Sequence, residues 1–256
     1  MKRSLVSFQG ECPLKCKHCY TTELNRQQMM DLETVVSSIE DENSDIIYVS
    51  HDYENFFDQE KGIELCERLF EKYNKHLFII TRMALKTAII NRLKQLYIYM
   101  RTRRKIIIFS ESIFALESYN VSEDCETPEK RIETLNRVAD IGIPTILMLR
   151  PVFPKKYVKL EEYRELIDRV KVTAVVTSGL IVTDSIIDKL NMRKESLKFS
   201  ANLGSEYLSS LNPESIHYVD VTEELKYIEQ ECKNRGIPCY RHSMEAVEQI
   251  IAGKGI

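Results

Sequence analysis

Three cysteines lie within eight residues near the start of the chain, in the segment Cys12-Pro-Leu-Lys-Cys16-Lys-His-Cys19. Cysteine thiolates are the usual protein ligands of iron–sulfur clusters, and a [4Fe–4S] cluster has four irons to be bound. Three cysteines therefore leave one iron without a protein ligand, open to a substrate or a cofactor. The C-x-x-x-C-x-x-C spacing thus predicts a reactive [4Fe–4S] cluster rather than a passive electron carrier.

Zinc is the main alternative metal for these thiols. A structural zinc site needs a fourth ligand, and His18 is the nearest candidate. His18 lies directly between Cys16 and Cys19, where its geometry is awkward, and the sequence holds no second C-x-x-C pair. Three unligated core cysteines are a further alternative, but the charged and polar residues between them make a poor core segment. A non-enzymatic zinc or iron–sulfur binding module therefore stays open beside the enzyme interpretation.

The composition is that of an ordinary globular protein. The 256 residues carry a net charge of −3, which recommends neither nucleic acid nor an acidic membrane as a partner. The seven cysteines are partly clustered and partly scattered in a long chain, unlike a secreted disulfide scaffold. No apolar run approaches about 18 residues, and residues 1–10 resemble a strand rather than a targeting segment. We therefore expect a cytoplasmic protein with no membrane segment.

Strands and helices must alternate to position the cysteine loop. Apolar, β-branched runs predict strands at 4–9, 45–50, 77–81, 105–110, 144–150 and 172–177. Amphipathic patterns predict helices between them at 31–40, 62–73, 84–96, 128–142 and 160–170. This alternation favours an α/β fold, a parallel sheet closed or partly closed into a barrel. Chemistry in such barrels lies at the carboxyl ends of the strands, and the cysteines follow the first strand directly.

The last third of the chain has a less regular pattern. Helices are expected near 184–192, 222–235 and 243–252, and short strands near 198–200, 217–219 and 237–240. No Gly-, Ser- or Pro-rich linker separates this part from the rest. We expect a core at 1–180 and a C-terminal α/β extension at 181–256 packed on the same domain.

The cysteine spacing, after a first strand and ahead of a (β/α) pattern, resembles the radical S-adenosylmethionine superfamily. This resemblance implies a partial (β/α)6 TIM-like barrel over roughly residues 3–180. It also implies that S-adenosylmethionine chelates the open iron through its amino and carboxylate groups. One electron, from a reducing flavodoxin- or ferredoxin-type donor, would then yield a 5′-deoxyadenosyl radical. That radical would abstract hydrogen from a small metabolite or a peptide.

Within the superfamily, the sequence is similar to the spore photoproduct lyase-like group. The similar segments are Cys16-Lys-His-Cys19-Tyr20, Val49-Ser-His-Asp-Tyr-Glu-Asn55, Ile80-Thr81-Arg82, Phe109-Ser110 and the stretch from Arg131 to Pro154. Two departures concern the end of the second strand. The group's hydrogen-donating cysteine is absent there, which weakens the alternative of nucleic-acid base repair. Its Gly-Gly-Glu is absent as well, so Ser50 or His51 would have to contact the methionyl amine.

The resemblance implies cofactor contacts at the neighbouring strand ends. Arg82 would meet the carboxylate of S-adenosylmethionine, and Ser110 would contact the cofactor from the fourth strand. The other expected contacts are Tyr20, Ser50, His51, Asp52 and Arg150. Turn capping for the polar residues, a salt bridge for Arg150 and simple packing for Tyr20 are the structural alternatives.

Cys125 is the candidate catalytic residue outside the cysteine segment. It follows the fourth strand, so it should lie on the active face. Its neighbours Asp124 and Glu126 should raise the pKa of the thiol, which disfavours a nucleophilic thiolate. A neutral thiol can still donate a hydrogen atom, and this is the role we expect for Cys125.

Overall fold

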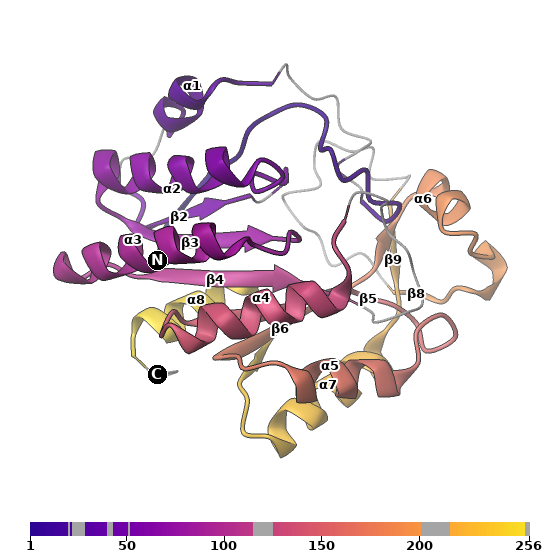
Figure 1. The fold of residues 1–256 in the computed structure, drawn as a ribbon. Helices are drawn as coiled ribbons and strands as arrows, with labels where there is room; N and C mark the ends of the chain where they lie inside the picture. Colours follow the sequence, from indigo (N-terminus) through magenta and orange to yellow (C-terminus); the bar gives the residue numbers. More distant parts are fainter. Residues whose placement is uncertain are drawn as a thin grey trace.

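A curved parallel sheet organises the protein in this computed structural model, which describes residues 1–19, 21, 29–39, 43–50, 52–114, 125–200 and 216–253. Seven described strands lie in the order β1-β2-β3-β4-β5-β6-β10 (Figure 1). Every neighbouring pair in this sheet is parallel. The strands are β1 (Arg3–Val6), β2 (Ile46–Val49), β3 (His76–Thr81), β4 (Ile107–Ser112), β5 (Thr145–Val152), β6 (Ala174–Gly179) and β10 (Cys239–Tyr240). The predicted α/β fold of partial-barrel type is thereby confirmed.

Most helices cover the outer face of this sheet. Alternate strand residues such as Ile79, Phe109 and Leu147 pack in the larger apolar core with the buried sides of these helices. The outer helices are α1 (Leu32–Ser37), α2 (Gln59–Tyr73), α3 (Thr87–Thr102), α4 (Pro128–Asp140), α5 (Leu160–Arg169) and α7 (Thr222–Asn234). Each crossover carries a helix to this face because parallel neighbouring strands require a long return connection.

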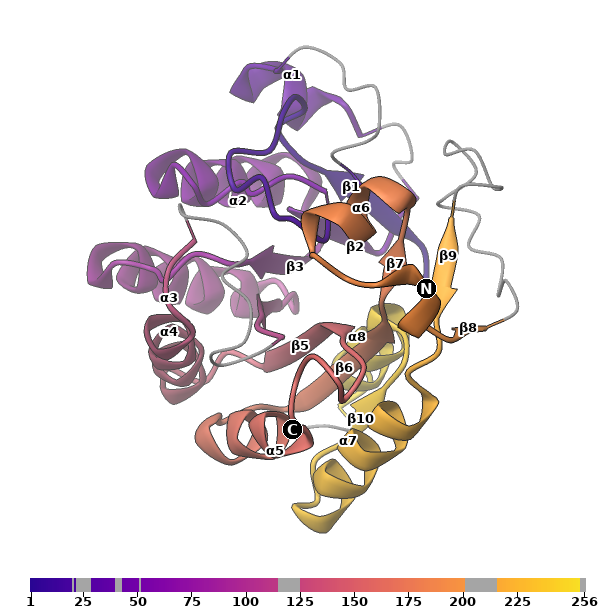
Figure 2. The same cartoon turned by 90° about the vertical axis from the view of Figure 1, so that its right-hand side faces the viewer.

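The inner face is covered differently, by the C-terminal helix α8 (Ser243–Ile251). Its buried residues Ala246, Val247 and Ile250 form a second core with the inward-facing residues of the sheet, among them Tyr48 and Phe78. Figure 2 shows α8 on the inside of the curve, close to β6. The partial barrel is therefore filled by a helix rather than closed by further strands.

A small antiparallel sheet lies at the carboxyl edge of the main sheet, the edge where its strands end. Its strands are β7 (Ile181–Val182), β8 (Phe199–Ser200) and β9 (His217–Val219), in the order β7-β9-β8. Helix α6 (Asp184–Lys189) and a 3-10 turn (Lys194–Ser196) accompany it. Figures 1 and 2 place it on the same side of the molecule as the segment that carries the cysteines.

The C-terminal third differs in one respect from expectation. Strand β10 pairs with β6 and extends the main sheet, with Cys239 opposite Val175. The isolated sequence pattern could not show this pairing, because β10 has only two residues and pairs with a distant strand. The division into 1–180 and 181–256 stays a prediction.

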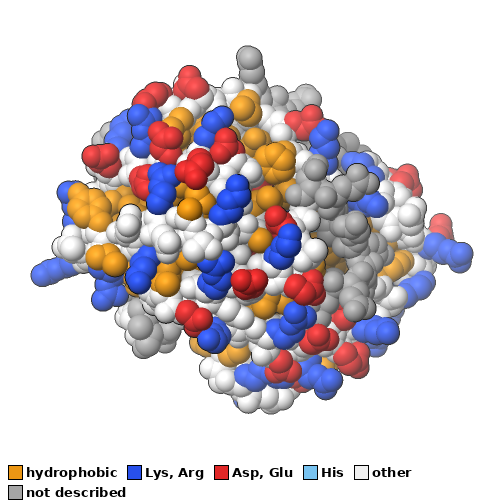
Figure 3. Space-filling model, in the orientation of Figure 1, with side chains coloured by type: hydrophobic (Ala, Val, Ile, Leu, Met, Phe, Trp, Pro, Cys, Tyr) orange, Lys and Arg blue, Asp and Glu red, His pale blue; other side chains and the backbone are white. Residues whose placement is uncertain are grey.

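The outer surface carries mixed charge. Figure 3 shows Lys and Arg side chains interspersed with Asp and Glu over the helical face. Arg92 of α3 illustrates the pattern, with ion pairs to Glu67 at 2.5 Å and to Glu60 at 2.7 Å. Arg101 and Arg103 are exposed near the end of α3, at the edge of the sheet opposite the cysteines. Among the described residues, no helix is long and apolar enough to span a membrane.

Candidate functional site

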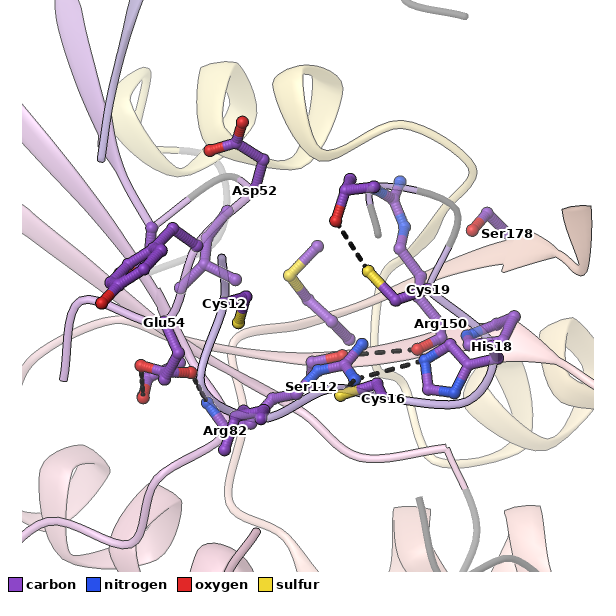
Figure 4. A pocket seen from close by; sticks show the side chains of 18 of the residues that line it. Cys12, Cys16, His18, Cys19, Asp52, Glu54, Arg82, Ser112, Arg150 and Ser178 are labelled. Atoms are coloured by element: carbon purple, nitrogen blue, oxygen red, sulfur yellow. Dashed lines mark hydrogen bonds between the residues drawn. The ribbon is translucent and has the colours of Figure 1, made fainter. Parts of the chain in front are cut away.

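A cavity of about 380 Å³ opens at the carboxyl edge of the sheet (Figure 4). This volume is within the usual range for sites that hold a cofactor or a small substrate. Its polar and thiol-bearing lining comes from many elements and includes Arg3, Cys12, Cys16, His18, Cys19, Tyr48, Ser50, Asp52, Glu54, Arg82, Ser112, Arg150, Ser178 and Ser243.

All three predicted cluster cysteines line this one cavity. Two short turns shape their loop: Lys15 N donates to Cys12 O at 3.3 Å, and Cys19 N donates to Cys16 O at 3.0 Å. Lys15 adopts a positive φ of 45°, which lets the chain reverse between the first two cysteines. Burial raises the pKa of the Cys12 thiol. Three thiols facing one cavity are a donor set that suits iron–sulfur ligation.

Arg82, at the end of β3, lies against this loop. Its Nη1 donates to Cys16 Sγ at 3.0 Å and lies 3.2 Å from His18 Nε2. Burial lowers the pKa of His18 well below its ordinary value, and the nearby Arg82 and Arg131 add to this decrease, so the ring is neutral. Because a guanidinium can only donate, Nε2 of His18 is the acceptor. His18 thus helps to hold a positive charge beside Cys16.

Zinc ligation by the same loop requires donors gathered around one point. Among the described residues, no group of three or more His, Cys, Asp or Glu side chains is arranged to hold a metal ion, and this applies to zinc and iron alike. His18 instead packs edge-on against Phe114, with ring centroids 4.9 Å apart, while its Nε2 is engaged by Arg82. These contacts give His18 a role in positioning Arg82.

Glu54 is a cavity residue that the sequence reasoning missed. Its buried carboxylate accepts hydrogen bonds from Thr81 Oγ1 at 2.8 Å, from Phe56 N at 3.0 Å and from Arg82 N at 2.8 Å. It therefore fastens the loop after β2 to the end of β3. Its burial raises the pKa of this carboxyl, while the three donors oppose the increase. The sequence signal that could have identified Glu54 is an acidic residue within five residues of the end of the second strand.

The predicted residues after β2 are only partly described. Ser50 lines the cavity with a positive φ of 70°, and its hydroxyl accepts from Asn55 N at 3.1 Å. Asp52 also lines the cavity, and its Oδ1 accepts from Ser7 Oγ at 2.5 Å. Ser50 therefore shapes the loop, as its capping alternative predicted, and both polar groups remain beside the cavity. His51 and Tyr20 lie outside the described residues.

Strand β4 continues two residues further than expected, and this changes which serine meets the cavity. Ser110 donates to Ile79 O at 3.1 Å inside the sheet and is not among the residues that line the cavity. Ser112 is on the same face and lines the cavity, with its hydroxyl donating to Arg150 O at 3.3 Å. A period of two along a strand would have pointed to Ser112 once the correct end of β4 was known.

Arg150 and Cys125 take different positions relative to the cavity. Arg150 lines it, and Nη2 of this residue donates to Arg241 O at 3.0 Å. Cys125 is not a lining residue, and its thiol donates to Arg82 O at 3.5 Å. Burial is the main cause of the raised pKa of Cys125, whereas the sequence suggested neighbouring acids. The structure thus brings the expected neutral thiol near Arg82 but not to the cavity wall.

A second buried carboxyl, Glu111, lies on the outer side of β4. Glu111 is fully buried, and neither of its oxygens has a hydrogen-bond partner among the described residues. Burial raises its pKa well above the ordinary value, and Glu54 adds to the increase, while Arg131 and Arg82 oppose it. Arg131 itself donates to Ser112 O at 2.9 Å. Glu111 and Arg131 are therefore close to Glu54 and Arg82 but do not themselves line the cavity.

Among the comparisons with known proteins, the one with solved structures supports the fold. No family model matches the sequence, and the search of curated proteins found no match. A solved mutant of spore photoproduct lyase is 10% identical, with a TM-score of 0.61 over 91% of this chain and 74% of that chain. Another, with bound AdoMet and dinucleoside spore photoproduct, is 11% identical, with a TM-score of 0.61 over 93% and 75%.

A methyltransferase gives the same result. The radical S-adenosylmethionine methyltransferase TsrM from Kitasatospora setae, with tryptophan and a SAM analog bound, is 12% identical. Its TM-score is 0.57, over 91% of this chain and 51% of that chain. The resemblance read from the cysteine motif is therefore matched by three-dimensional similarity, and the chain has the fold of these radical S-adenosylmethionine enzymes.

Proposed function

We propose that this protein is a radical S-adenosylmethionine enzyme that acts on a small metabolite or a peptide. The observation that most strongly supports this proposal is that Cys12, Cys16 and Cys19 line one cavity at the carboxyl edge of the sheet. The solved structures of similar fold support the proposal: one spore photoproduct lyase structure has bound AdoMet, and one TsrM structure has a bound [4Fe–4S] cluster. A reducing flavodoxin- or ferredoxin-type protein is the proposed electron donor.

The proposed cofactors are a [4Fe–4S] cluster and S-adenosylmethionine. Together they would supply a 5′-deoxyadenosyl radical that abstracts a hydrogen atom from the substrate. The chain's part is to bind, orient and shield these groups. Cys12, Cys16 and Cys19 would hold the cluster, and the buried residues around them, such as Leu14, keep water from the loop.

Arg82 is the proposed partner of the cofactor carboxylate. It carries a positive charge at the cavity wall, 3.0 Å from Cys16 Sγ. The hydrogen bond from its backbone nitrogen to Glu54 fixes its position. An arginine held in this way can keep its bond to a thiolate and still present other N–H groups to a carboxylate.

Polar groups on both sides of Arg82 complete the proposed cofactor site. Ser50 and Asp52 would face the cofactor from the loop after β2, and Ser112 would take the part first expected of Ser110. His51 and Tyr20 stay predictions of the sequence alone. The role of Cys125 as a hydrogen-atom donor stays a prediction. To reach the substrate, its thiol would first have to break its hydrogen bond to the carbonyl oxygen of Arg82.

The test is anaerobic reconstitution of the cluster, chemical reduction and assay of 5′-deoxyadenosine formed from S-adenosylmethionine. We expect a brown protein that forms this product, and we expect loss of the visible absorbance in C12A, C16A and C19A. Cys239→Ala is the matched control, since Cys239 lies on β10 outside the cavity lining. A colourless wild-type protein with one bound zinc would contradict the proposal, and so would retention of the cluster by the three variants.

A further inference from the structure

The inner end of the cavity gathers groups that favour a negative charge. Arg3 of β1 and Arg150 of β5 line it, together with the hydroxyl-bearing residues Tyr48 of β2 and Ser243 of α8. Arg3 is opposite Ile46 in the parallel register, and Ile46 belongs to the inner core. The Arg3 side chain therefore starts on the inner face of the sheet, where Arg3 stays exposed to solvent on the edge strand β1.

The hydroxyl of Tyr48 is the centre of this group. The guanidinium carbon of Arg3 is 5.3 Å from the centroid of the Tyr48 ring. The hydroxyl interacts with the side chains of Ser243 and Arg3 and lies 3.7 Å from Met244 Sδ. Burial raises the pKa of Tyr48, and both Arg3 and Arg150 oppose the increase. Two guanidinium groups are thus close enough to one phenol to act on it.

Helix α8 adds a third source of positive potential. It follows β10, which is parallel to β6, so its N-terminus lies at the same edge of the sheet as the cysteine loop. Its N-cap, His242, makes no side-chain capping hydrogen bond, and its first residue, Ser243, lines the cavity. Uncapped N–H groups and the helix dipole favour an anion at this end. The acid of this first turn, Glu245, is exposed and acts on Tyr240 instead.

The acids of the cavity lie elsewhere. Figure 4 shows Glu54 and Asp52 on the side of Cys12, whereas Arg150 and Ser178 lie on the side of Cys19. The carboxylate of Glu54 is already bonded to Thr81, Phe56 and Arg82. The carboxylates of the cavity therefore lie on the side of Arg82, apart from Arg150.

We propose that Arg3, Arg150, Tyr48 and the N-terminus of α8 bind an anionic oxygen group of the substrate, either a carboxylate or a phosphate. Guanidinium groups pair with both through two parallel hydrogen bonds, so the shared chemistry is an oxyanion. This assignment rests on the proposed function, because it takes the same cavity as the reaction site. It moves Arg150 from cofactor contact to substrate contact and leaves Arg82 for the cofactor carboxylate. The reacting C–H would then lie between this anion and the cysteine loop.

The experiment measures anion binding directly, by calorimetry on the cluster-loaded protein under anaerobic conditions. Inorganic phosphate and acetate are titrated separately into wild type, R3Q, R3K and the control R103Q. Arg103 is the exposed C-cap of α3 and does not line the cavity. We expect at least one anion to bind wild type and R103Q equally, and R3Q to bind it about tenfold or more weakly. R3K, which keeps the charge but not the paired donors, should fall between them. The tighter of the two probes identifies the group as phosphate or carboxylate.

Several results would overturn the assignment. Absence of binding by both anions in wild type, or equal binding by wild type and R3Q with matching melting curves, removes the site. A loss of S-adenosylmethionine affinity in R3Q as large as its loss of anion affinity would show that these residues bind the cofactor and not the substrate. Formation of 5′-deoxyadenosine by wild type is scored separately, so the radical chemistry and the anion site can fail independently. If R3Q melts at a lower temperature, R150Q provides the second test of the same prediction.

Discussion

At the scale of single residues, Glu54 connects the cavity to the sheet. Its carboxylate accepts three hydrogen bonds, two of them from the backbone nitrogens of Phe56 and Arg82. We expect Glu54→Ala to lower the free energy of unfolding by about 3 kcal/mol, because it leaves buried hydrogen-bond donors without an acceptor. Urea unfolding measures this, with the exposed Glu64→Ala as control. A change below about 0.5 kcal/mol, the usual size for a surface substitution, would contradict this role.

Glu111 should make stability depend on pH. Its native pKa is raised well above its ordinary value by burial, with Glu54 adding to the increase and Arg131 and Arg82 opposing it. The native state then binds more protons than the unfolded state, so the free energy of unfolding falls as pH rises from about 4.3 through the native pKa. The contribution is complete below the unfolded pKa and is lost above the native one.

The Glu111→Gln variant cannot titrate at this position. We expect its free energy of unfolding to fall less steeply between acid and mildly alkaline pH than that of wild type. Urea unfolding at a series of pH values measures both slopes. Parallel curves for the two proteins would show that Glu111 is not the titrating group.

That Cys12, Cys16 and Cys19 would lie together could be predicted because they are neighbours in sequence, and all three do line one cavity. Ser112 and Glu54 could not be placed in the same way. The choice of Ser112 over Ser110 depends on where β4 ends, and the position of Glu54 depends on the path of the loop after Ser50. Both are set by packing and hydrogen bonds between distant segments, which a single sequence does not display.

At the scale of elements, α2 contains a glycine where alanine would ordinarily be better. A Cβ on Gly62 would lie 2.9 Å from Asn55 O and 2.9 Å from Phe56 Cδ1. The loop that carries Glu54 passes over this position, so it would have to move. We expect Gly62→Ala to destabilise the protein by about 1–3 kcal/mol by overpacking, despite the roughly 1 kcal/mol that alanine gains over glycine in a helix.

Unfolding in urea tests this, with Lys61→Ala at the adjacent exposed position as control. A more stable Gly62→Ala protein would mean that the loop yields easily and that α2 does not fix it.

The order of strands and helices was predictable from periodicity, and the six strands expected between residues 4 and 177 correspond to β1 through β6. The location of α8 was not. An amphipathic pattern shows that a helix buries one side, but not which face of a sheet receives it. That choice follows from the pairing of β10 with β6 and from the inner residues left uncovered by the other helices.

At the scale of the whole molecule, α8 keeps the inner face of the sheet dry. Its removal would expose Tyr48, Phe78 and Met148 along with their inner-face neighbours. We expect a chain cut before Ser243 to bind the dye ANS strongly and to unfold without a sharp transition, as compact states with exposed apolar surface do. A chain cut after Ile251 is the control. Weak dye binding and a sharp melt in the shorter chain would show that the sheet is stable without the helix.

The cavity draws on both the first strand and the last helix, through Arg3 and Ser243. During synthesis Arg3 leaves the ribosome before Ser243, which follows every strand of the main sheet. The inner apolar face of the sheet therefore stays exposed to water and to chaperones until α8 has been synthesised. A cluster delivered to the cysteine loop during that interval would enter a cavity that still lacks its inner wall. Insertion of the proposed cluster should accordingly follow the docking of α8 on the sheet.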